Sequence, residues 1–137
     1  MKRSYCEIYI HCVWTTKYKE AMIKESIFEY IHKIIMEKCK KYSLELIALG
    51  GTEDHIHVLL SINPQIKISE VIAEIKGTAS YFINHNTKDT LYWQDGYGVI
   101  SISKPALEKV KHYVLTQKEH HSEKNGTRLE LEKTHTE

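Results

Sequence analysis

Two histidines near the middle of the chain have the residue type and the spacing of metal ligands. His55 and His57 are separated by one residue, inside an alternating stretch at 54–62 whose other face is aliphatic. Side chains two apart on a strand point to the same side, so the two imidazoles would lie next to each other. Two neutral imidazoles leave coordination positions open for substrate oxygens and water. The pair indicates an open metal site, although surface or packing histidines would give the same pattern.

A second group of polar residues follows on a predicted helix. Tyr113, Gln117 and His121 recur every four residues and therefore lie along one side of that helix. A phenol can attack a phosphodiester where a metal polarises the phosphate and a neighbour accepts the proton. The amide oxygen of Gln117 could complete the shell of the same metal. The alternative is an ordinary amphipathic helix with Gln117 exposed.

Hydrophobic periodicity predicts the elements that position these residues. Alternation predicts strands at 4–15, 44–50, 54–62 and 97–103, and helical spacing predicts helices at 21–42, 67–86 and from about 103 to 121. The order βαββαβ followed by a third helix predicts an α+β, ferredoxin-like antiparallel sheet. In that fold the first and third strands are central neighbours and the first two helices cover one face. His11 would then point outward from the strand beside His55 and His57.

Composition sets the class of protein. A chain of 137 residues, 42% apolar and 27% charged, is typical of a globular protein with one domain, here 1–121. We expect the polar tail at 122–137 to be flexible. No apolar run predicts a membrane span, and no signal segment is present, so we expect a cytoplasmic protein. Three widely spaced cysteines predict buried thiols rather than disulfides or a thiolate zinc site. A net charge of +1 gives no general attraction to nucleic acid.

Together these features resemble a known family, the single-tyrosine HUH transposases of small insertion sequences and their REP-associated tyrosine transposase relatives. The resemblance covers most of the chain, from about Tyr9 to His121. It is carried by the ordered segments IHCVWTTKYK (10–19), DHIHVLL (54–60), IKG (75–77), WQDGYG (93–98), YVLTQ (113–117) and HH (120–121).

The resemblance implies a function and a site. Tyr113 matches the nucleophile that forms a 5′-phosphotyrosine, and His55, His57 and Gln117 match the ligands of a magnesium or manganese ion. The implied partners are hairpin-bearing single-stranded DNA and a second copy of the chain, in the cytoplasm and nucleoid of a bacterium or archaeon.

Candidate DNA contacts combine basic side chains with aromatic rings, which suit phosphate contact and base stacking. Lys17 and Lys19 bracket Tyr18, and lysines recur along the predicted third helix, where they could equally form its solvated face. The full set is His11, Lys17, Tyr18, Lys19, Lys76, Lys104, Lys111 and His121.

Three other functions fit parts of the pattern. A ferredoxin-like sheet with Tyr5 and Tyr9 on its open face could be an RNA-recognition module, which would leave the histidine pair without a role. A phosphoester hydrolase of the His-x-His-x-His type would need a third histidine where Leu59 stands. A domesticated regulator would keep DNA binding without cleavage.

Overall fold

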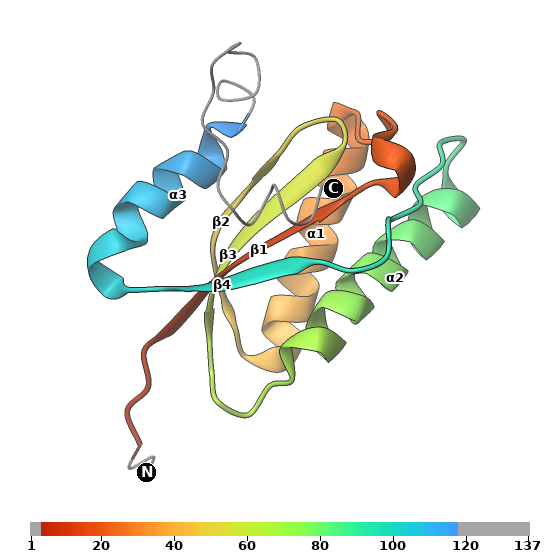
Figure 1. Ribbon diagram of the computed structural model, residues 1–137. Helices are drawn as coiled ribbons and strands as arrows, with labels where there is room; N and C mark the ends of the chain where they lie inside the picture. Colours follow the sequence, from red (N-terminus) through yellow and green to blue (C-terminus); the bar gives the residue numbers. More distant parts are fainter. Residues whose placement is uncertain (1–3, 118–137) are drawn as a thin grey trace.

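Four antiparallel strands form one sheet (Figure 1). The computed structural model describes residues 4–117. In it β1 (Ile8–Thr15), β2 (Glu45–Gly51), β3 (His55–Ile62) and β4 (Gly98–Ile102) lie in the order β2-β3-β1-β4. The predicted α+β class is confirmed, and the strand order is that of the ferredoxin-like pattern with β1 and β3 in the centre.

The two long helices cover one face of the sheet. α1 (Glu25–Tyr42) and α2 (Ile68–Asn86) lie side by side over it (Figure 1). Alternate residues of β1 point into the core beneath them, as the period of two predicted: Ile10, Cys12 and Trp14 are buried there. Trp14 is thus a core residue. Glu74 of α2 ties the helices together by bonding three side chains of α1, Lys38, Lys41 and Tyr42.

The opposite face of the sheet is covered in part by α3 (Leu107–Leu115), which packs on β2 and β3. A small separate cluster of Ala48, Leu59 and Val114 joins the helix to the sheet. Gly50 allows this close approach, because a Cβ built there would lie 1.7 Å from the carbonyl oxygen of Val114. The position therefore requires glycine.

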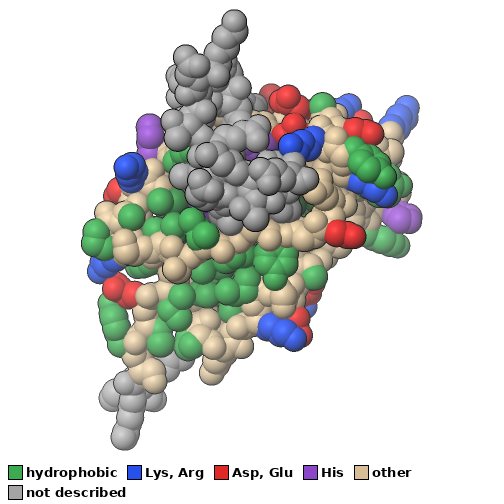
Figure 2. All heavy atoms as spheres, in the orientation of Figure 1, with side chains coloured by type: hydrophobic (Ala, Val, Ile, Leu, Met, Phe, Trp, Pro, Cys, Tyr) green, Lys and Arg blue, Asp and Glu red, His purple; other side chains and the backbone are tan. Residues whose placement is uncertain are grey.

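Beside α3, the same face carries exposed hydrophobic residues. Figure 2 shows hydrophobic side chains gathered on the near face of the molecule, next to the sheet edge formed by β4. The side chain of Ile100, on this edge strand, is 41% exposed. An edge strand with an exposed apolar residue can pair with another chain.

Three predicted element boundaries are wrong, and in the first two a tertiary partner decides the backbone. Residues 4–7 are not strand, since Ile8 already pairs with Ile62, the last residue of β3. Residues 21–24 are not helix, because the amides of Met22 and Ile23 donate to the carbonyl of Glu53. The third helix is preceded by a 3₁₀ turn (Lys104–Ala106). Its predicted continuation to His121, and the tail at 122–137, lie outside the described residues.

The cysteines are free thiols, as predicted, but only two of them are buried. Burial raises the pKa of Cys12 to about 12 and that of Cys39 to about 11. Cys6 is exposed, because the first strand begins after it. Among the helices of residues 4–117, none is both long and apolar enough to cross a membrane.

Candidate active site

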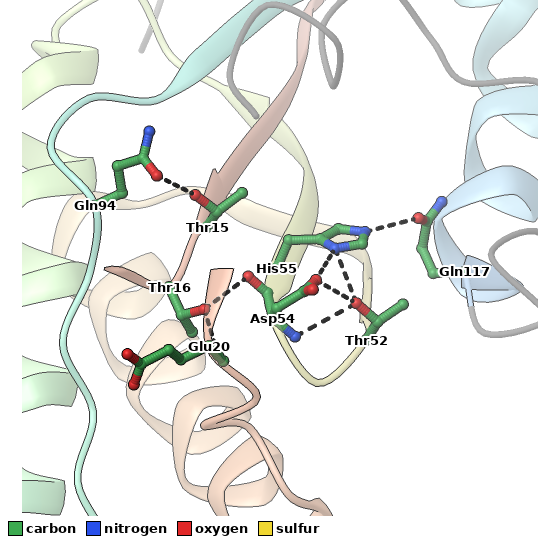
Figure 3. Close-up of polar contacts among 8 residues, drawn as sticks. All are labelled: Thr15, Thr16, Glu20, Thr52, Asp54, His55, Gln94 and Gln117. Carbon is green, nitrogen blue, oxygen red and sulfur yellow. Dashed lines mark hydrogen bonds and ion pairs between the residues drawn. The ribbon is translucent and has the colours of Figure 1, made fainter. Parts of the chain in front are cut away.

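The turn before β3 fixes the orientation of His55 (Figure 3). Asp54 Oδ1 and Thr52 Oγ1 each lie 2.8 Å from His55 Nδ1, and the Thr52 hydroxyl also donates to Asp54 Oδ1 at 3.0 Å. A carboxylate only accepts hydrogen bonds, so Nδ1 carries the proton. In the neutral ring, Nε2 therefore presents a lone pair.

Gln117 faces that nitrogen from the end of α3. Its Nε2 donates to the carbonyl of Tyr113 at 2.8 Å, which fixes the amide so that Oε1 points toward His55 Nε2, 3.4 Å away. Gln117 is 1% exposed, so the alternative of an exposed polar helix residue is wrong. The structure thus places a polar atom from the sheet, His55 Nε2, next to one from the end of the helix, Gln117 Oε1.

These donors fit a divalent cation. With the proton on Nδ1, His55 Nε2 and Gln117 Oε1 meet as two lone-pair donors, an arrangement that a cation between them stabilises. Adjacent oxygen ligands of octahedral Mg²⁺, at about 2.1 Å from the ion, stand about 3 Å apart. Within the described part of the chain, no group of three or more His, Cys, Asp or Glu side chains could hold a metal ion. The candidate set therefore depends on the amide.

His57 and Tyr113 complete the group. His57 is fully buried, and its ring centroid lies 5.1 Å from that of His55. The ring of Tyr113 stands edge-on to that of His57, with 5.8 Å between centroids. The structure therefore places four of the predicted site residues, His55, His57, Tyr113 and Gln117, around one point where α3 meets β3.

His11 belongs to this group rather than to an open DNA-binding face. It is fully buried, and its Nε2 lies 2.7 Å from His57 Nδ1. Its ring is also 6.4 Å from that of Tyr113. His11 does lie on the predicted face of the sheet, beside His57, but it is buried there instead of open to DNA.

The turn after β1 lies at the same end of the sheet. Thr15 pairs with His55, so the 3₁₀ turn Lys17–Lys19 begins just beyond the histidines. Tyr18 is 78% exposed in a left-handed conformation, φ 57°, and Lys17 Nζ lies 5.5 Å from its ring centroid. Thr16 bonds the carbonyls of Asp54 and Glu20 and so ties this turn to the turn before β3 (Figure 3).

The other predicted DNA contacts are placed differently. Lys76 donates to the carbonyls of Gln94 and Gly96 at 2.9 and 2.8 Å, and its burial lowers its pKa. It holds the loop before β4 instead of facing solvent. Lys104 forms an exposed ion pair with Glu7. Lys111 is half-buried on α3, and His121 lies outside the described residues.

Sequence reasoning missed three residues of the site. Thr52 and Asp54 stand three and one residues before His55, a local spacing that could have shown them as its hydrogen-bond partners. Gly50 gave no such signal, since its importance depends on its strand pairing with His57 and on the approach of Val114.

Fold and site together define a small α+β protein whose candidate site residues converge where a helix meets the central strands. The family model for IS200-like transposases matches residues 4–117, and the chain belongs to that family. The ISDra2 transposase TnpA of Deinococcus radiodurans is 24% identical over 114 residues, covering 78% of this chain and 81% of its own. The IS200 transposase of Salmonella typhimurium is 24% identical over 128 residues, covering 88% and 82%.

Two solved structures share the fold. A Deinococcus radiodurans transposase superposes with a TM-score of 0.65 at 21% identity, over 83% of this chain and 93% of that one. A REP-associated tyrosine transposase bound to a REP hairpin superposes with a TM-score of 0.69 at 13% identity, over 88% and 73%.

Proposed function

We propose that this protein cuts and rejoins single-stranded DNA through a covalent bond to Tyr113. The observation that carries the proposal is the convergence of Tyr113, on α3, and Gln117, just beyond its end, with His55 and His57, on β3. Family membership supports DNA as the substrate. The binding-module alternative gives no reason for this convergence.

The proposed reaction is a transesterification. The Tyr113 phenol oxygen attacks phosphorus, the bond from phosphorus to the 3′-oxygen breaks, and the proton lost by the phenol is balanced by one gained on the departing 3′-oxygen. The products are a 5′-phosphotyrosine and a 3′-hydroxyl, and a second 3′-hydroxyl reverses the step to rejoin DNA. Edge-on packing against His57 and the hydrogen bond from Gln117 to its carbonyl fix the position of Tyr113.

The proposed cofactor is Mg²⁺ or Mn²⁺, held by His55, His57 and Gln117. When bound, such an ion would polarise the phosphate and stabilise the charge that develops on its oxygens. The orientation of His55 by Asp54 and of Gln117 by the Tyr113 carbonyl supports this assignment, because both present lone pairs to the same point.

For the DNA we propose a hairpin-bearing single strand. One structural relative is bound to a REP hairpin. In this chain the exposed Tyr18, between Lys17 and Lys19, offers a base-stacking ring flanked by phosphate-binding charges at the end of the sheet where His55 lies. Lys111, on α3, stays a predicted contact, and so does His121, which lies outside the described residues.

The test is adduct formation. The protein is incubated with hairpin-bearing oligonucleotides and Mg²⁺ or Mn²⁺, and a denaturant-resistant protein–DNA band is measured. We expect an adduct that is lost with chelator and in Tyr113→Phe, and kept in Tyr81→Phe, a matched control at an exposed tyrosine of α2. An adduct that survives Tyr113→Phe would overturn the assignment of Tyr113 as the nucleophile. Tight RNA binding without any adduct would favour the binding module.

A homodimer is the proposed assembly, supported by the exposed Ile100 on edge strand β4. Sedimentation of the wild type and of Ile100→Lys tests it. Mixing Tyr113→Phe with His55→Ala then distinguishes two arrangements. Because the four side chains converge within one chain, we expect the mixture to form no adduct; an active mixture would show that the tyrosine serves its partner's histidines.

A further inference from the structure

His11 contacts Nδ1 of His57, which leaves Nε2 as the other ring nitrogen of His57. His11 comes from the central strand β1 and lies diagonally opposite His57 on β3, two residues out of register, since His11 pairs with Leu59 and His57 pairs with Val13. Both rings are fully buried, and the contact between His11 Nε2 and His57 Nδ1 is 2.7 Å. This is a direct hydrogen bond between two imidazoles held by the sheet.

The polarity of this bond follows from the role of His57. A neutral imidazole has one donor and one acceptor nitrogen. If His57 offers the Nε2 lone pair to a metal, its proton is on Nδ1, and His11 Nε2 must accept. We propose that His11 is a positioning residue that fixes the tautomer and ring orientation of His57 for metal binding. This rests on the metal set of the proposed function.

The two histidine ligands would then be oriented by different chemistry. Asp54, a carboxylate, accepts from His55, whereas His11, a neutral ring, accepts from His57. The ring of Tyr113 lies beside both His57 and His11. A phosphate attacked by Tyr113 must enter this side of the site, and a second buried carboxylate there would repel it. A neutral acceptor orients His57 without that repulsion.

The test distinguishes the effect of the hydrogen-bond acceptor of His11 from the effect of its ring shape. His11→Gln keeps an acceptor at about the reach of Nε2, whereas His11→Phe keeps the ring shape and removes the acceptor. Mn²⁺ binding to the DNA-free protein is measured from the resonance signal of free Mn²⁺. Loss of an outer-shell partner costs about 10- to 100-fold in metal affinity. We expect that loss in His11→Phe and a change of only a few-fold in His11→Gln and in His32→Phe, an exposed control on α1.

A second readout uses no metal at all. Long-range ¹H–¹⁵N spectra report the imidazole tautomer. The cross-peaks of His57 are assigned as those that disappear in His57→Asn. We expect His57 protonated on Nδ1 in the wild type and in His11→Gln, and not in His11→Phe. Thermal unfolding, measured with chelator present, shows whether each variant is folded.

Two results would overturn the proposal: His57 protonated on Nε2 in the wild type, or wild-type Mn²⁺ affinity in folded His11→Phe. Failure of the proposed function is a separate result. If the Phe and Gln variants differ as expected but no hairpin oligonucleotide gives an adduct, the nicking reaction is wrong and the role of His11 is supported.

Discussion

Substitution of Gly50 tests whether the docking of α3 sets the geometry of the site. Gly50 lies on β2, paired with His57, and an alanine methyl there would sit 1.7 Å from the Val114 carbonyl oxygen. Real Cβ contacts under 3.0 Å are essentially absent from proteins, so α3 must move away by at least about 1.3 Å if the strand stays in place. Tyr113 and Gln117, on either side of Val114, would move with it.

The magnitude follows from that displacement. A misplacement of about 1 Å at a reacting group can cost about 10²-fold in rate, so we expect Gly50→Ala to form adduct about 100-fold more slowly at saturating DNA. Overpacking of this kind costs about 1–3 kcal/mol of stability. The main core beneath α1 and α2 does not include Val114, so the sheet and these helices should stay folded.

The assay is single-turnover adduct formation, with urea denaturation alongside it. Gly77→Ala is the matched control, because a Cβ there meets nothing within 4 Å and the residue lies inside α2. That variant should keep the wild-type rate and gain about 0.5–1 kcal/mol, as alanine replaces glycine in a helix. A wild-type rate in Gly50→Ala would refute the reasoning, since α3 would then not need its contact with β2.

Two further predictions concern the scaffold. Lys76→Met should lower stability by about 1–2 kcal/mol through loss of two hydrogen bonds to loop carbonyls; unchanged stability with weaker DNA binding would instead make Lys76 a DNA contact. Hydrogen bonds from Lys41 and Tyr42 lower the pKa of Glu74 to about 2. A carboxyl whose folded-state pKa is depressed stabilises fully above its usual pKa near 4.5 and loses this as pH falls toward 2. In urea titrations, the stability difference between wild type and Glu74→Gln should therefore shrink from pH 5 to pH 2.5, and a constant difference would contradict the bond.

The order of the elements was predictable because each has one apolar face of the right period. Ile10, Cys12 and Trp14 alternate along the strand predicted at 4–15, and all three are buried. Boundaries were less predictable. Nothing in residues 21–24 themselves shows that the amides of Met22 and Ile23 will bond Glu53 rather than begin a helix.

The site was predictable where its geometry is local. A spacing of two on a strand, or of four on a helix, places side chains together whatever the rest of the chain does, and His55, His57, Tyr113 and Gln117 have such spacings. Contacts between elements were not predictable. Lys76 has the charge of a DNA contact, but the path of the loop before β4 brings two carbonyls to it.

The same distinction explains how the site is built. Both proposed histidine ligands stand on the central strand β3; Asp54 Oδ1 contacts His55 from the turn before that strand, and His11 Nε2 contacts His57 from the neighbouring strand β1. Tyr113 and Gln117 stand on a helix joined to that sheet by a small cluster around Val114. The proposed ligand set is therefore rigid in its histidines and adjustable in its amide. Since Gln117 bonds the carbonyl of Tyr113, any shift of α3 moves the proposed nucleophile and the proposed third ligand together.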